Sequence, residues 1–86
     1  MPFTFKLDKP RDMQATFERL KARLATTGGL LTGNEEEGFI SVEGVEGRYV
    51  VEENAIKVTI TKKPVAIIPN RLIEKEIRGV FREMYG

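Results

Sequence analysis

The chain has 86 residues, enough for one small domain, and its 41% hydrophobic and 31% charged residues are typical of a folded protein rather than a disordered one. Its net charge of +1 excludes a strong overall field that would attract nucleic acid or an anionic membrane. The chain contains no cysteine and no histidine, which excludes disulfides, thiolate chemistry and the common zinc ligands. No stretch resembles a signal peptide or a membrane span, so we expect a single cytoplasmic domain covering residues 1–86.

The N-terminal third predicts a strand followed by a helix. Apolar and polar residues alternate over residues 2–7, as in a half-buried strand whose place in a sheet the pattern does not define. Asp8 is the predicted N-cap of an amphipathic helix of about five turns that stops at Gly28 and Gly29. The apolar face of this helix carries Met13, Phe17, Leu20 and Leu24.

Residues 30–38 give a weaker signal. Two leucines predict a short strand at 30–32, and the polar run after it predicts a solvated loop. The three glutamates at 35–37 lack the spacing of a calcium-binding loop, so we interpret them as part of a soluble turn rather than a metal site.

The strongest pattern covers residues 39–61 and predicts a three-stranded meander with two-residue loops at 43–44 and 53–54. These loops set the register, so that Val42 faces Val45 and Tyr49 faces Val58. One face then collects eight large side chains: Ile40, Val42, Val45, Tyr49, Val51, Ile56, Val58 and Ile60. The other face is polar, with Phe39 and Val50 as its apolar exceptions. Such a sheet needs a layer of helix over its apolar face.

Two prolines bracket the next apolar segment, residues 65–68, and predict an extended connector. Its side chains either pack beneath the last helix or form an exposed association patch; we favour packing, because so small a domain needs them in its core.

Asn70 is the predicted cap of a second amphipathic helix. Its apolar face carries Ile73, Ile77, Val80, Phe81 and Met84, with Leu72 at the flank. The opposite face carries a basic stripe made of Arg71, Lys75, Arg78 and Arg82. This stripe is either the solvated side of the helix, supported by Glu74 four residues before Arg78, or a contact surface for phosphates.

Together these elements predict an α+β fold in two layers, in the order β-α-β-β-β-β-α. An antiparallel sheet of four or five strands would carry both helices on one face.

The residue types argue against catalysis. Ser41 is the only serine, and the chain offers no imidazole to activate it. The glycines match neither a phosphate-binding loop nor a dinucleotide-binding motif. We expect that the protein is not an enzyme and that it binds neither a cofactor nor a metal ion.

Three segments resemble a family of small bacterial proteins described as polyhydroxyalkanoic acid system proteins, which are associated with storage granules. These segments are residues 44–47 (GVEG), 56–60 (IKVTI) and 73–77 (IEKEI). The resemblance covers about half of the chain and implies a small binding or accessory domain with the fold described above.

We therefore expect a small non-catalytic binding or accessory module that binds an apolar small molecule, a protein partner or a second copy of itself. It would use either the cleft between the helices and the sheet or the proline-bracketed segment. The candidate contact residues are Val65, Ile67, Ile68 and Tyr49. The alternative is weak nucleic-acid binding through the basic stripe, which the near-neutral charge of the chain does not favour.

Overall fold

The computed structural model describes residues 3–42, 44–63 and 69–84. Within these residues the chain forms five strands and two helices, in the predicted order β-α-β-β-β-β-α. The elements are β1 (Phe3–Asp8), α1 (Met13–Ala25), β2 (Leu30–Gly33), β3 (Glu37–Val42), β4 (Val45–Val51), β5 (Ala55–Lys62) and α2 (Asn70–Met84). The protein therefore has the α+β architecture that the sequence pattern predicts.

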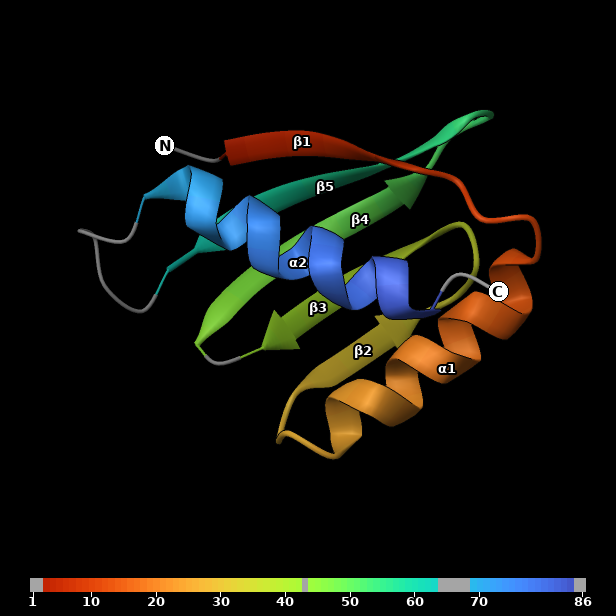
Figure 1. Cartoon of the computed structure of the whole chain (residues 1–86), viewed down its shortest axis with the longest axis horizontal. Coiled ribbons are helices and arrows are strands. Elements are labelled where there is room, and N and C mark those ends of the chain that lie inside the picture. Colours follow the sequence, from red (N-terminus) through yellow and green to blue (C-terminus); the bar gives the residue numbers. More distant parts are fainter. Residues whose placement is uncertain (1–2, 43, 64–68, 85–86) are drawn as a thin grey trace.

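The strands form one antiparallel sheet in the order β1-β5-β4-β3-β2 (Figure 1). The meander of β3, β4 and β5 has the predicted register, with Val42 opposite Val45 and Tyr49 opposite Val58. Short loops set this register, and a slip by one residue would turn the apolar side chains of a strand to solvent.

The two edge strands are the ones that precede and follow α1 in the chain. β1 pairs with β5, so that Phe5 lies opposite Val58 and Leu7 lies opposite Ile56. β2 pairs with β3 at the opposite edge. The chain thus crosses from one edge of the sheet to the other through α1, and this placement is what the sequence pattern left undefined.

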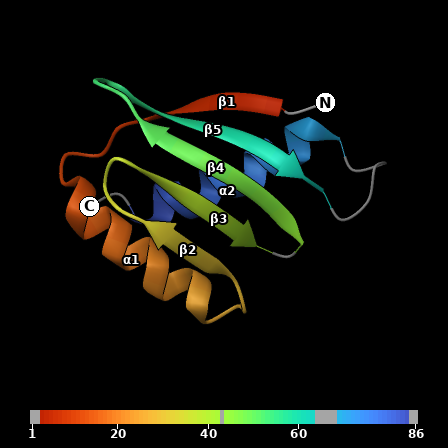
Figure 2. The same ribbon diagram turned by 180° about the vertical axis from the view of Figure 1, so that it is seen from behind.

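Both helices lie on the same face of the sheet, as predicted. α2 runs across the sheet and α1 lies along the β2 edge (Figure 1), and from behind the strands lie in front of α2 (Figure 2). The buried apolar side chains between the two layers form one core, which comprises Phe5, Leu7, Phe17, Leu20, Leu24, Leu31, Ile40, Tyr49, Ile56, Val58, Ile60, Ile73, Ile77 and Phe81.

The first helix begins later than the sequence predicted. β1 continues through Asp8, whose pairing with β5 holds it in an extended conformation. The N-cap is instead Asp12, whose Oδ1 accepts a hydrogen bond from the N–H of Ala15 at 3.0 Å. The helix ends at Ala25, before the predicted glycine stop, and its 13 residues make it shorter than five turns. Gly28 then turns the chain with a φ of 79°.

The start of α2 differs from the prediction in its capping contact. The Asn70 side chain, expected to cap the helix, accepts a hydrogen bond from Lys63 Nζ at 3.0 Å. The backbone carbonyl of Pro69 accepts hydrogen bonds from the N–H groups of Leu72 and Ile73, at 3.0 and 3.4 Å. The end of β5 is thereby tied to the first turn of α2.

The face of the sheet away from the helices is mostly polar. Lys6 pairs with Glu52 at 3.1 Å, and Lys62 pairs with Glu46 at 3.6 Å. Val50 is 47% exposed on this face. Exposed ion pairs of this kind contribute little to stability, about 0–1 kcal/mol each, so these charges mainly keep the face soluble.

Candidate functional site

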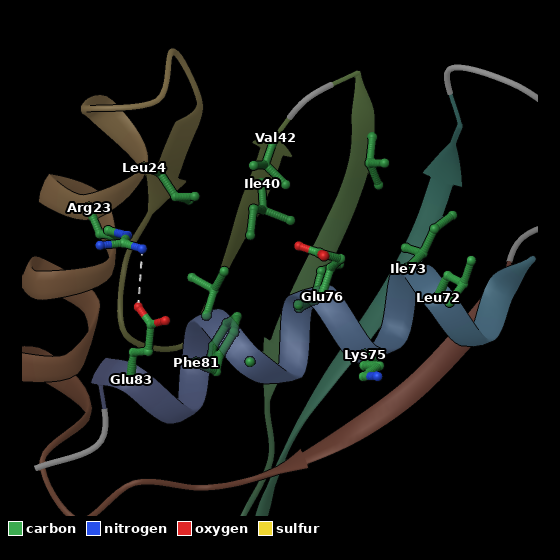
Figure 3. Close-up of a pocket in the computed structure, with 14 residues that line it drawn as sticks. Arg23, Leu24, Ile40, Val42, Leu72, Ile73, Lys75, Glu76, Phe81 and Glu83 are labelled. Atoms are coloured by element: carbon green, nitrogen blue, oxygen red, sulfur yellow. Dashed lines mark ion pairs between the residues drawn. The ribbon is translucent and has the colours of Figure 1, made fainter. Parts of the chain in front are cut away.

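A groove of about 740 Å³ lies between α2, the ends of β3 and β4, and the last turn of α1 (Figure 3). Its lining is mostly apolar and comes from three parts of the chain. The apolar lining residues are Leu24 from α1, Ile40, Val42 and Val45 from the sheet, and Leu72, Ile73, Ile77, Val80 and Phe81 from α2. A concave apolar surface of this size falls within the range of sites that bind small molecules, roughly 300–1,000 Å³.

The wall formed by α2 follows from the spacing of its apolar residues. Ile73, Ile77 and Phe81 recur every four residues and face the sheet, where each is at most 5% exposed. Leu72 and Val80 lie on the flank of this buried face and border the groove. Leu72 is 48% exposed, which is high for a leucine beside a core.

The floor of the groove is the apolar side of the β3–β4 hairpin. Ile40 is buried at 4% exposure, whereas Val42 and Val45, which face each other at the end of the hairpin, are half-buried. The two helices are linked near the C-terminal end of α2 and diverge toward this hairpin (Figures 1 and 3). Their divergence leaves the hairpin end of the sheet less covered than its centre.

The rim of the groove carries balanced charges. Arg23 of α1 and Glu83 of α2 form an ion pair at 3.2 Å that links the two helices at one end (Figure 3). Lys75 and Glu76 also border the groove, and neither has an ion-pair partner among the described residues. Among the described residues, the rim therefore carries two cations and two anions.

The chain matches no family model, and no curated protein or solved structure matches it. Neither helix in the described parts of the chain has the length and apolar character needed to cross a bilayer. The site is therefore interpreted from its own geometry.

The four residues of the basic stripe have different surroundings. The Arg78 Nε donates a hydrogen bond to Glu74 Oε2 at 2.7 Å, and its guanidinium lies over the Phe5 ring at 5.5 Å from the ring centre. The ion pair between Arg78 and Glu74 is the one that their spacing predicts. The contact with the Phe5 ring holds Arg78 against β1. Lys75 borders the groove, and Arg71 and Arg82 are exposed.

Tyr49 lies in the core and does not line the groove. Its hydroxyl donates a hydrogen bond to the backbone carbonyl of Asn34 at 2.6 Å, and its ring packs near that of Phe17, with 6.4 Å between centres. Burial raises the pKa of Tyr49 from 10.0 to about 12, because the phenolate would lose its hydration. The tyrosine thus stays protonated at neutral pH.

The remaining candidate contact residues, Val65, Ile67 and Ile68, lie outside the described residues. Among the residues that are described, no three acidic side chains gather closely enough to hold a metal ion.

The sequence pattern predicts a cleft between the helices and the sheet but does not identify the residues that line the groove. Val42, Val45 and Val80 were assigned to the core from their periodicity, and all three are instead half-buried at its margin. Leu72, which the helical periodicity places at the flank of the apolar face, also borders the groove. Where the helices diverge depends on contacts between distant residues, which periodicity does not report.

Proposed function

We propose that this protein is a small non-catalytic binding module that takes an apolar group of a ligand or partner into the groove beside α2. The observation that carries this proposal is the groove itself, in which nine of the 14 described lining residues have apolar side chains. Burying such surface contributes about 25 cal/mol per Å² removed from water. An occupant that fills the groove would therefore gain affinity mainly from apolar contact.

The residue types support a non-catalytic role. The chain has no histidine and no cysteine, so the commonest general base and the thiol nucleophile are missing. Ser41 lies on β3, on the face of the sheet opposite the helices, where it is half-buried and paired with Leu30 and Glu46. Among the described residues, four charged side chains border the groove, and Arg23 and Glu83 among them are already paired with each other.

The balanced rim also narrows the class of occupant. An anionic head group beside Lys75 would lie close to Glu76, and a cationic group beside Glu76 would lie close to Lys75, because the two residues are neighbours on the same helix. Neither charge sign is favoured by the pair as a whole. The groove suits an uncharged apolar group better than a fatty acid held by its carboxylate.

A neutral fluorescent probe tests the proposal. N-phenyl-1-naphthylamine, which fluoresces strongly only in apolar surroundings, is titrated into the dilute protein, and the amide spectrum is recorded alongside. We expect saturable fluorescence and amide shifts at Leu24, Val42, Val45 and Val80. The variant V80F, which places a larger side chain in the groove, should reduce probe binding about tenfold, a loss of about 1.4 kcal/mol.

The matched control is V50F, which makes the same change on the opposite face of the sheet, where Val50 is 47% exposed. It should bind the probe like the wild type. Absence of saturable binding, equal losses in V80F and V50F, or amide shifts centred on Phe39 and Val50 would each refute a binding site in the groove.

A further inference from the structure

We infer that the occupant of the groove is a second copy of this chain, which presents its own α2. This inference rests on the proposed function and names its partner. Two α2 helices would pack antiparallel about a two-fold axis that passes between Lys75 and Glu76. Each Leu72 would then enter the groove of the other copy beside Gly79.

The contact surface is a stripe of four residues on α2: Leu72, Lys75, Glu76 and Gly79. Their spacing of i, i+3, i+4 and i+7 places them along one side of a helix. All four are exposed, and all four border the groove. The stripe therefore borders the groove and is also an accessible surface of the helix. Figure 3 shows Glu76 on the side of α2 that faces the hairpin and Lys75 on the opposite side.

The stripe is complementary to itself when the second helix runs in the opposite direction. In a two-fold contact, residue i meets residue j and residue j meets residue i. An axis centred between Lys75 and Glu76 places Lys75 of each copy opposite Glu76 of the other, so that two equivalent ion pairs form. The same operation places each Leu72 opposite Gly79 of the other copy. Opposite charges meet, and the apolar side chain of the stripe meets its glycine.

Gly79 lowers the stability of α2, and no contact within the described part of the single chain explains why a glycine stands at this position. Glycine inside a helix destabilises it by roughly 0.5–1 kcal/mol relative to alanine. A Cβ added to Gly79 would meet no atom of the described chain within 4 Å, and its φ is not in the left-handed region. Close approach of a leucine from outside, onto bare helix backbone, is a use for the missing side chain.

Glu76 differs from the other acidic residues of α2 in its ion pairing. Glu74 is paired with Arg78 at 2.7 Å, and Glu83 is paired with Arg23 at 3.2 Å. Glu76 has no such partner among the described residues, and neither does its neighbour Lys75. Arg71 and Arg82 of α2 likewise have no ion pair among the described residues, so the lack of a partner sets Glu76 apart only from the other acidic residues of the helix. The two-fold contact would pair Lys75 and Glu76 between copies.

Sedimentation velocity of the intact protein, from about 1 µM to about 1 mM, tests the inference at affinities typical of small interfaces. We expect concentration-dependent dimerisation by the wild type. K75E and E76K each place like charges opposite each other and should weaken dimerisation at least about tenfold. The double variant K75E/E76K exchanges the two signs and should restore it.

The most demanding test of the inference is to mix the two single variants. K75E carries two acidic residues at these positions and E76K carries two basic ones, so the mixture should form heterodimers while each variant alone stays monomeric. K57E is the matched control, because it makes the same charge change on an exposed residue of β5, away from the helices. It should dimerise like the wild type.

Each outcome decides the inference. A wild type that is monomeric throughout, a double variant that fails to dimerise, or a mixture without heterodimers would overturn it. If the wild type is monomeric but the naphthylamine probe still binds in the groove, the second copy is excluded as the occupant and the binding module remains. If the probe also fails to bind, both proposals fall.

Discussion

The hydroxyl of Tyr49 donates a hydrogen bond to the backbone carbonyl of Asn34 at 2.6 Å, across 15 positions of sequence. The Asn34 side chain in turn accepts hydrogen bonds from the N–H groups of Glu36 and Glu37, at 2.8 and 3.0 Å. Asn34 thus closes the turn between β2 and β3, and Tyr49 ties that turn to the core. The edge strand β2 is held in place by this contact as well as by its pairing with β3.

Removing the hydroxyl with Y49F should lower the free energy of unfolding by about 1–2 kcal/mol, because the ring keeps its packing while the Asn34 carbonyl loses its donor. Urea denaturation followed by circular dichroism measures the change. In addition, amide exchange should accelerate at residues 34–38 more than at β5. An unchanged unfolding midpoint would show that the bond contributes nothing.

The same residue predicts a loss of stability in alkali. Burial raises the pKa of Tyr49 from 10.0 in the unfolded chain to about 12 in the folded protein, so the folded state holds the proton more tightly. Its contribution is complete below pH 10 and is lost as the pH rises to about 12. Lysines also titrate in this range, so the quantity to measure is the difference in unfolding free energy between wild type and Y49F. That difference should shrink between pH 10 and 12.

Alanine at Gly38 should destabilise the protein by about 1–3 kcal/mol. A Cβ at Gly38 would meet the Tyr49 hydroxyl at 2.6 Å and would also collide with the Thr32 backbone carbonyl, which cannot move without disturbing β2. Thermal unfolding of G38A measures the effect. A melting temperature equal to that of the wild type would mean that β2 shifts freely at this edge.

Alanine at Gly79 should have the opposite effect. Nothing in the described chain lies within 4 Å of the new Cβ, so G79A should stabilise the isolated chain by about 0.5–1 kcal/mol through helix propensity alone. The measurement is made at low protein concentration, where a dimer would be dissociated. A destabilised G79A would reveal a close contact at this position within the chain.

The cap of the first helix gives a further prediction. D12A should cost about 1 kcal/mol, because the N–H of Ala15 loses the Asp12 carboxylate that accepts its hydrogen bond. D12N should retain most of the stability, since asparagine caps about as well as aspartate. Equal losses in D12A and D12N would indicate that the charge of Asp12 matters more than the cap.

Local sequence determined the meander and the apolar faces of both helices. Two short loops and strict alternation leave one register for β3, β4 and β5, which is why Val42 lies opposite Val45 and Tyr49 opposite Val58 as predicted. Likewise, a spacing of about 3.6 residues is enough to show that Phe17 in α1 and Ile77 in α2 face the core. These features depend on neighbours within a few residues.

Only the tertiary structure decided where the elements meet. Asp8 has a side chain suited to capping a helix, but its pairing with Ala55 of β5 keeps it in β1. The N-cap of α1 is therefore Asp12. The groove arises in the same way, because the two helices pack against opposite parts of one sheet and diverge over the hairpin that ends at Val42 and Val45. Sequence periodicity reports which side of an element is apolar. It does not report how much of that side the neighbouring elements cover, because coverage depends on the angles and distances at which separate elements pack.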